Sequence, residues 1–293
     1  MGLLKFKKFI QYHLRHQPVN HPAQEHELGI VRLGYNPIEF KNSLWRVSNS
    51  FEVRERIRIA FQGSEYPIFE VRLGSSRESA PRLFILSGIH GNEEGGILAV
   101  PVILERLREQ PQLVSKVNVR ILAPVNPVGA YNHSRYNASG HDINRDFVNF
   151  RTPEARLIRL LFDEYKPDFV LSLHEGPQRG TFMFANACVP ATMALALVEA
   201  LQRAHVELAE RDYFGRRLDP PGLAVATWPS QALVAAWARY FHMMTVHEYA
   251  ARRGIPEITL ETSWRSGEWY NRILPHVELV LELLKQLGSW VQE

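Results

Sequence analysis

Short apolar runs alternate with stretches of helical periodicity along most of this chain, and this alternation limits the folds open to it. The segment 94–107 carries apolar residues near the 3.6-residue repeat of an amphipathic helix: Ile97, Val100, Ile103, Leu104 and Leu107. We expect strands at 56–61, 68–73, 82–87, 117–122, 169–173, 181–184 and 257–261. We expect helices at 94–107, 153–165, 192–211, 230–240 and 269–287. Strands that alternate with helices predict an α/β fold, with a mixed, mostly parallel sheet and helices on both faces.

The length and composition fit a single domain. A chain of 293 residues with 45% hydrophobic residues can bury a sizeable core. The sequence contains no internal repeats, low-complexity segments or clear linkers. We therefore predict one domain over residues 1–293, in which residues 1–50 are an N-terminal extension packed on the rest.

The charge, the length of the apolar stretches and the cysteine content limit the partners and the location we expect for this protein. The formal net charge is only +3, which gives no support for a nucleic-acid partner. No apolar stretch reaches the roughly 18 residues of a transmembrane helix, so we expect no stable membrane insertion. Cys188 is the only cysteine, which fits a reducing compartment, and we expect a cytoplasmic protein. The oligomeric state stays open, with a homo-oligomer as one option.

A histidine and a glutamate stand three residues apart on the turn that follows the apolar strand at 82–87. These residues are His90 and Glu93, and a further histidine, His174, ends the strand predicted at 169–173. Two imidazoles and one carboxylate can bind a single cation, and three protein ligands with an open fourth position are typical of catalytic zinc. The pattern points to metal-assisted hydrolysis.

More polar residues follow other predicted strands. Arg135, Asn144 and Arg145 belong to the loop after the strand at 117–122, and Glu261 ends the strand at 257–261. In open α/β sheets, sites form at the carboxyl ends of the strands, where side chains from several loops meet. We therefore expect these residues to lie near His90, Glu93 and His174.

In this order, the motifs resemble those of the zinc carboxypeptidase superfamily, which includes carboxypeptidase A-like metallopeptidases and the succinylglutamate desuccinylase/aspartoacylase group. The resemblance covers roughly residues 62 to 265, and it implies the phosphorylase/hydrolase-like fold of zinc carboxypeptidases. The matching segments are Gly88-Ile89-His90-Gly91-Asn92-Glu93, Asn126-Pro127-Val128-Gly129, Arg135-Tyr136, Asp142-Ile143-Asn144-Arg145-Asp146-Phe147, Leu173-His174-Glu175 and Thr259-Leu260-Glu261.

The resemblance implies roles for four of these residues at the centre of the site. His90, Glu93 and His174 match the ligands of one Zn²⁺ ion per chain. Glu261 matches the general base. A carboxylate within hydrogen-bond reach of the attacking water can take its proton and pass it to the leaving amine.

The resemblance also assigns three residues to the substrate. Arg135 matches the arginine that polarises the scissile carbonyl and stabilises the oxyanion. Asn144 and Arg145 match the pair that binds a substrate carboxylate, for which a planar, bidentate guanidinium is well suited. The alternative for Arg145 is a salt bridge within its own loop, to Asp142 or Asp146.

Four further residues are candidates for substrate binding. Peptidases of the superfamily have a tyrosine before the catalytic glutamate that closes over the substrate, and both Tyr240 and Tyr249 could match it. Arg252 and Arg253 stand where the deacylase branch keeps a substrate-binding arginine. Their alternative is a pair of solvated loop charges.

The sequence leaves three functional hypotheses. The first is a zinc-dependent hydrolase that cleaves an amide or peptide bond next to a substrate carboxylate, like a metallocarboxypeptidase. The second is an N-acyl amino acid deacylase of the succinylglutamate desuccinylase/aspartoacylase type, so the expected partner is a peptide or N-acyl amino acid that bears a carboxylate. The third is a catalytically silent metal- or ligand-binding protein. A dinucleotide-binding protein is disfavoured, because the turn at 88–93 lacks the G-x-G-x-x-G spacing.

Overall fold

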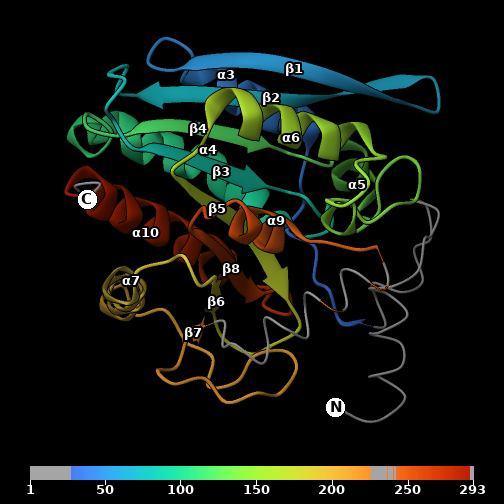
Figure 1. Ribbon diagram of the computed structural model, residues 1–293. Helices are drawn as coiled ribbons and strands as arrows, with labels where there is room; N and C mark the ends of the chain where they lie inside the picture. The colour runs from blue at the N-terminus through green and yellow to red at the C-terminus, as the bar shows by residue number, and fades with distance from the viewer. Residues whose placement is uncertain (1–27, 226–235, 237–239, 241, 291–293) are drawn as a thin grey trace.

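The structure is a computed structural model that describes residues 28–225, 236, 240 and 242–290. Its centre is an eight-stranded sheet with the strand order β1-β2-β4-β3-β5-β8-β6-β7 (Figure 1). The strands are β1 (Glu52–Phe61), β2 (Ser64–Gly74), β3 (Arg82–Ser87), β4 (Asn118–Ala123), β5 (Phe169–Gly176), β6 (Phe182–Ala185), β7 (Leu223–Val225) and β8 (Glu257–Ser263).

The four central strands run parallel to one another. β3 pairs with β4 on one side and with β5 on the other, and β5 pairs with β8. The chain therefore moves outward from β3 in both directions. In a doubly wound sheet, the crevice at such a switch point, beyond the carboxyl ends of the strands, is the usual place for a site.

Helices cover both faces of the sheet (Figure 1). Residues of α3, α4, α7 and α10 share one hydrophobic cluster, and residues of α6 and α9 share the other. The helices are α3 (Pro37–Arg46), α4 (Glu94–Glu109), α5 (Pro127–Asn132), α6 (Pro153–Tyr165), α7 (Ala191–Arg203), α9 (Val246–Arg252) and α10 (Trp269–Gly288), with short 3₁₀ turns at Pro111–Leu113 and Ile143–Arg145.

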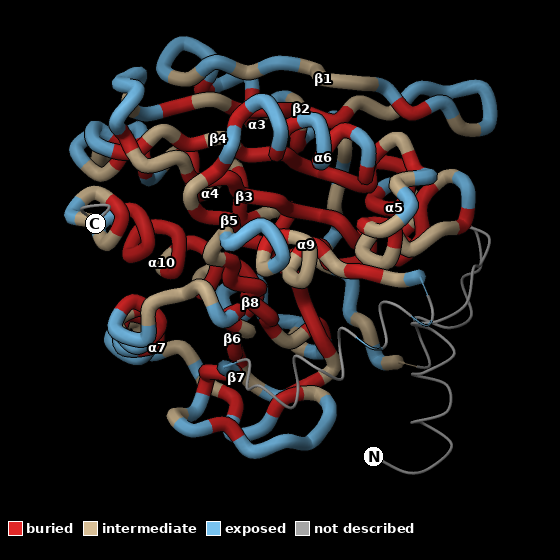
Figure 2. The backbone as a smooth tube through the Cα atoms, viewed as in Figure 1, coloured by how far each residue is buried: buried red, intermediate tan, exposed pale blue. Residues whose placement is uncertain are grey.

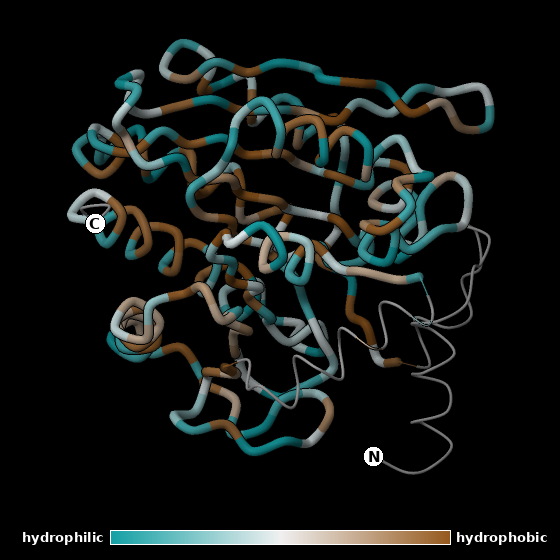
Figure 3. The backbone as a smooth tube through the Cα atoms, viewed as in Figure 1, coloured by the Kyte–Doolittle hydropathy of each residue, from teal (hydrophilic) through white to brown (hydrophobic). Residues whose placement is uncertain are grey.

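The central strands form the interior of the molecule. Every residue of β5 is buried, and so is every residue of β8 but the last. Figure 2 shows this burial along the middle of the sheet, and Figure 3 shows hydrophobic residues along the same strands. Strands covered on both faces read as near-continuous apolar runs, which is why the sequence located them.

The predicted fold class is confirmed, and some element boundaries differ. The sequence placed a helix at 192–211, but α7 ends at Arg203. His205 adopts a left-handed φ of 56°, and the backbone N–H of Val206 donates to the carbonyl of Leu201, which closes the helix end. The short elements α3, α5, α9 and β7 were not predicted. The predicted helix at 230–240 lies, except for two residues, outside the described part of the chain.

Among the described residues, no helix combines the length and apolar character needed to span a bilayer.

Candidate metal centre

The turn that follows β3 is shaped by two glycines. Gly88 has a φ of +70°, a conformation that L-residues rarely adopt. Gly91 lies against the backbone of α5, where a Cβ atom would come within 2.0 Å of the carbonyl carbon of Gly129. The turn can therefore pack directly on α5 and direct His90 and Glu93 toward the end of β5.

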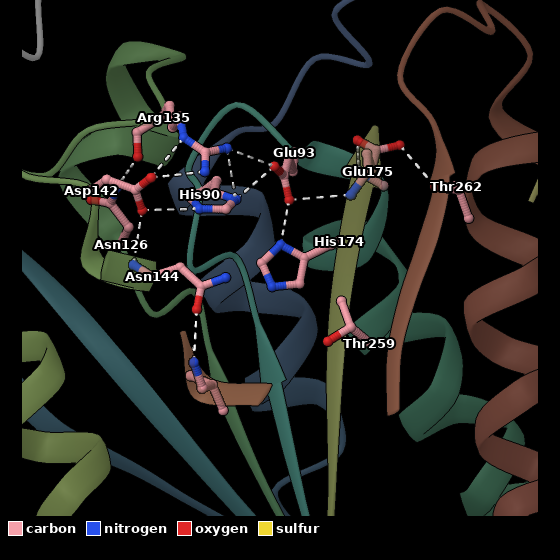
Figure 4. A network of polar contacts seen from close by, with 12 residues as sticks. His90, Glu93, Asn126, Arg135, Asp142, Asn144, His174, Glu175, Thr259 and Thr262 are labelled. Carbon is pink, nitrogen blue, oxygen red and sulfur yellow. Dashed lines mark hydrogen bonds and ion pairs between the residues drawn. The ribbon is translucent and has the colours of Figure 1, made fainter. Parts of the chain in front are cut away.

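The structure brings His90, Glu93 and His174 together as one buried cluster (Figure 4). Glu93 lies between the two imidazoles: its Oε1 is 2.6 Å from Nδ1 of His90, and its Oε2 is 2.7 Å from Nδ1 of His174. One ligand atom from each of the three side chains lies within 4.8 Å of the others. Two imidazole nitrogens and a carboxylate oxygen this close together form a ligand set that suits a divalent transition metal ion.

Asp142 orients His90 from the opposite side of its ring. Its Oδ1 lies 3.2 Å from Nε2 of His90, which leaves Nδ1 facing Glu93. A carboxylate on the far nitrogen of a histidine fixes the tautomer and orientation that metal binding needs. Although burial alone would raise the pKa of Asp142, the charges of Arg135, His90 and Arg145 hold it well below its ordinary value.

Arg135 is buried beside the same cluster. It donates from Nε and Nη2 to Oδ2 of Asp142, at 2.9 and 2.8 Å. Its Nη1 lies 3.6 Å from Oε1 of Glu93, so part of the guanidinium faces the cluster. Asn126 supports this position by donating from its side chain to the backbone carbonyl of Arg135 at 3.2 Å. The residue predicted to stabilise an oxyanion therefore lies at the cluster and is held by fixed partners.

The two imidazoles favour the ionised form of the Glu93 carboxyl group. Burial opposes its ionisation, but the charges of His90 and His174 outweigh burial and lower the pKa of Glu93 well below its usual range. An anionic ligand between two imidazoles is the form that binds a cation.

Glu261 stands beside His174 on the neighbouring strand. The register of β5 and β8 pairs these two residues directly, so both side chains project from the same face of the sheet. Glu261 is 7% exposed, and among the described residues no donor reaches its Oε2. Burial and the charge of Glu93 raise the pKa of Glu261 well above its ordinary value. The predicted general base is thus a buried carboxyl group with one oxygen available.

Asn144 and Arg145 lie on the loop after β4, at the other flank of the cluster. The side-chain oxygen of Asn144 accepts from the backbone N–H of Val246 at 3.0 Å, which ties this loop to the start of α9. Arg145 donates to the carbonyl of Asn144 at 2.9 Å. Within the described chain it forms no salt bridge, so the alternative of an ion pair with Asp142 or Asp146 is not seen.

Three of the residues predicted to bind substrate lie elsewhere. Arg252 pairs with Glu248, and Arg253 donates to Asp163 on α6 at 2.7 Å. Both arginines immediately precede β8 and so lie at the opposite edge of the sheet from Glu261. Tyr249 packs on Phe162 of α6, with ring centroids 5.2 Å apart. The positions of the two arginines fit solvated charges better than a role in substrate binding. Tyr249 also lies away from the cluster.

Tyr240 is 79% exposed, and most of the residues around it lie outside the described chain. A different tyrosine, Tyr213, lies beside Glu261. Burial, and then the charge of Glu261, raise the pKa of the Tyr213 phenol. Tyr213 comes from the irregular segment between α7 and β7, which carries no periodic signal. Its position depends on packing against Phe182, at a centroid distance of 5.7 Å, and sequence spacing did not reveal it.

A buried ion pair supports the cluster from behind. Glu175 follows His174 and receives two hydrogen bonds from Arg272 of α10, at 2.6 and 2.5 Å, and both side chains are fully buried. The backbone N–H of Glu175 donates to Oε2 of Glu93 at 3.1 Å. The position of two predicted ligands, Glu93 and His174, is therefore linked to this pair.

The N-terminal segment is attached next to the cluster. The carboxylate of Glu94 accepts from the backbone N–H groups of Leu33, Gly34 and Tyr35. Arg272 also donates to the carbonyl of Val31 at 2.5 Å. Residues 31–35 therefore pack on α4, the helix that begins directly after the turn of His90 and Glu93.

A further buried carboxyl group, that of Glu154, supports the loop that carries Arg135 and Asp142. Glu154, near the start of α6, is fully buried and accepts from the side chain of Asn137 at 3.0 Å. Asn137 in turn accepts from the backbone N–H groups of Ser139 and His141. Burial raises the pKa of Glu154 from its ordinary value of 4.5 to about 7.

We expect Glu154→Gln to flatten the dependence of stability on pH. In the wild type, the folded carboxyl group holds its proton more tightly than the unfolded one, so the free energy of unfolding should fall as the pH rises from 4.5 to about 7. A shift of this size corresponds to about 3 kcal/mol. In urea unfolding from pH 4.5 to 8, the free energy of unfolding of the variant should rise relative to that of the wild type as the pH increases. Glu164→Gln, on the exposed face of α6, is the control, and identical pH profiles for wild type and Glu154→Gln would contradict the prediction.

The structure thus combines a mostly parallel α/β sheet with a buried His-Glu-His cluster, at its switch point, that could hold a metal ion. Comparison with known proteins identifies which families this chain is similar to. Residues 79–211 match the succinylglutamate desuccinylase/aspartoacylase catalytic domain. Carboxypeptidase 2 of Trichophyton rubrum is 26% identical over 178 residues, which cover 55% of this chain and 33% of the relative. The chain thus matches about a third of the length of such curated relatives.

Solved structures show the same fold. A metallo-carboxypeptidase from Burkholderia cenocepacia has a TM-score of 0.66 and 15% identity, covering 88% of this chain and 70% of that one. A metallo-carboxypeptidase from Pseudomonas aeruginosa, in complex with (2-guanidinoethylmercapto)succinic acid, has a TM-score of 0.60 and 18% identity, covering 87% and 70%. Residues 79–211 thus match a succinylglutamate desuccinylase/aspartoacylase catalytic domain, and the chain shares its fold with solved metallo-carboxypeptidases, so the resemblance predicted from its motifs is confirmed.

Proposed function

We propose that this protein is a zinc-dependent hydrolase that cleaves an amide or peptide bond next to a substrate carboxylate. The observation that carries the proposal is the convergence of a three-ligand cluster with a buried carboxyl group, Glu261, and a fixed guanidinium, Arg135. A carboxylate-bearing ligand in the Pseudomonas aeruginosa relative agrees with the proposed substrate class.

His90, Glu93 and His174 would hold the zinc ion, with one ion per chain. When bound, zinc would supply a Lewis acid and lower the pKa of a coordinated water. The remaining chemistry belongs to the protein. Oε2 of Glu261 would take a proton from the attacking water and deliver it to the leaving nitrogen.

Arg135 and Arg145 would act on the substrate. The guanidinium of Arg135 would stabilise negative charge on the carbonyl oxygen, and fixed donors of this kind contribute about 3–4 kcal/mol in other hydrolases. Arg145 and the side-chain amide of Asn144 would bind the carboxylate of the leaving group. Binding at this flank would place the scissile carbonyl over the cluster.

The second candidate is an N-acyl amino acid deacylase that uses the same site. The match of residues 79–211 to the desuccinylase/aspartoacylase domain favours this alternative. A panel of C-terminal dipeptides and N-acyl acidic amino acids separates the two, because activity on one set only decides between them. A cytoplasmic location stays a prediction.

We expect metal binding to depend on His90. Purified wild-type protein should hold about one equivalent of zinc by mass spectrometry, and His90→Ala should lose at least tenfold in zinc affinity because one of three protein ligands is removed. His205→Asn is the control, since His205 is exposed, lies outside the cluster and has a left-handed backbone that asparagine tolerates. Stoichiometric, tightly bound zinc in His90→Ala would rule out the ligand assignment. Background activity in zinc-loaded wild type would instead favour a silent binding protein.

A further inference from the structure

The side-chain amide of Gln178 is fixed in one orientation beside Glu261. Gln178 lies just after β5 and is 7% exposed. Its Nε2 donates to the backbone carbonyls of Glu261 and Thr262, both at 3.1 Å, and lies 3.4 Å from the carbonyl of Gly180. Carbonyl oxygens only accept hydrogen bonds, so the nitrogen must face them. The oxygen Oε1 is therefore directed away from β8.

This oxygen has no donor among the described residues, and the same is true of Oε2 of Glu261. The two oxygens border the same space. A Cβ atom at Gly176 would lie 2.3 Å from Oε1 of Gln178, 3.2 Å from Oε2 of Glu261 and 3.2 Å from the ring of Tyr213. Oε1 of Gln178 thus lies where a side chain at position 176 would be, and only glycine permits this arrangement.

The space belongs to the catalytic side of the sheet. Gly176 and His174 are two residues apart on β5, so both face the same way. Asn144 and Arg145 follow β4. Gly176 is the last residue of β5, Gln178 follows it, and both contact β8, on the far side of β3 from β4. A substrate whose carboxylate binds Arg145 and whose scissile carbonyl lies at the cluster would extend its acyl side toward Gly176.

Buried polar atoms almost always have a hydrogen-bond partner, and a buried acceptor without one is costly. Two acceptors without donors at the edge of a site therefore indicate a ligand that brings a donor. Oε2 of Glu261 is accounted for by the water whose proton it takes. Oε1 of Gln178 cannot take a proton at neutral pH and needs a donor that stays in place.

We propose that Oε1 of Gln178 accepts a hydrogen bond from an N–H group on the acyl side of the scissile bond. The inference rests on the proposed hydrolase function and specifies which of its possible substrates the site would prefer. In a peptide, the residue that supplies the scissile carbonyl carries its own N–H. The acyl group of a simple N-acyl amino acid, such as a succinyl or acetyl group, carries none. The geometry thus favours peptides over N-acyl amino acids.

The test uses two substrates that differ in this one group. The first is an N-acylated dipeptide with a free C-terminal carboxylate. The second is identical except that an ester oxygen replaces the N–H of the first residue, so the scissile amide is unchanged. We expect zinc-loaded wild type to show kcat/KM about tenfold higher for the first substrate. In Gln178→Met, which keeps the length of the side chain, this ratio should fall to within about twofold of one.

A purely structural role for Gln178 would lower both rates together and leave their ratio unchanged. An equal ratio in wild type and Gln178→Met would therefore overturn the inference. The wild-type ratio is a readout that needs no variant, and a value near one would also overturn it. Faster hydrolysis of N-acetyl or N-succinyl amino acids than of the dipeptide would overturn the inference but leave the hydrolase function standing. No turnover of any of these substrates by zinc-loaded wild type would overturn both.

Discussion

Glu261→Gln is expected to lower kcat by about 10³- to 10⁴-fold and to leave the bound zinc unchanged. Glutamine keeps the shape of the side chain but cannot take a proton. General acid–base catalysis by one positioned group commonly contributes 10²–10⁴-fold, and here one carboxyl group would serve both halves of the reaction. Oε2 of Glu261 is a buried oxygen without a donor among the described residues, on the strand next to His174, which suits it to accept this proton.

Two measurements make this result specific. Zinc content should match that of the wild type, because Glu261 is outside the three-ligand cluster. Glu268→Gln, at an exposed position just after β8, should keep wild-type activity. Turnover of zinc-loaded Glu261→Gln within tenfold of the wild type would show that another group acts as the base.

Arg272→Met is expected to lower the free energy of unfolding by about 3–5 kcal/mol, the usual cost of removing one partner from a buried ion pair. Arg272 and Glu175 are both fully buried and joined by two short hydrogen bonds. Without the guanidinium, the carboxylate of Glu175 would stay in the interior, and within the described part of the chain its remaining donors would be the N–H of Gly95 and the hydroxyl of Thr262. Methionine fills much of the space of the arginine side chain but cannot form an ion pair with the carboxylate of Glu175.

Urea unfolding in the presence of a chelator measures this loss without the contribution of bound metal. The double variant Arg272→Met/Glu175→Gln should be more stable than Arg272→Met alone, because it also removes the unpaired charge. Arg265→Met, at an exposed position before α10, should stay within about 0.5 kcal/mol of the wild type. An Arg272→Met protein within 1 kcal/mol of the wild type would contradict the expected role of the pair.

Stability and site geometry are coupled through this pair. Glu175 follows His174 directly, and its N–H donates to Glu93 at 3.1 Å. A shift of Glu175 would therefore move both ligands. The sequence analysis treated Glu175 only as part of a motif, and its partner on α10 lies 97 residues away in the chain. No spacing rule connects two residues at that distance.

The separation of Arg252 and Arg253 from the cluster has a related cause. Arg252 and Arg253 were placed in the site from their distance to Glu261 along the chain. However, β8 is extended, so residues just before its start lie at the opposite end of the strand from Glu261, which is near its carboxyl end. Tyr213 was overlooked for the converse reason, because a long irregular segment returns it to the end of β8.

By itself, the sequence determined the alternation of strands and helices and the polar residues at the strand ends. Both are local properties: apolar periodicity sets the elements, and a histidine or glutamate at the end of a buried parallel strand must emerge at one edge of the sheet. His90, Glu93, His174 and Glu261 could therefore be identified together. Only the tertiary structure decided which side chains support them. Asp142 behind His90, Arg272 behind Glu175 and Gln178 beside Glu261 hold their places through strand order, register and helix packing, which bring distant parts of the chain within hydrogen-bond distance.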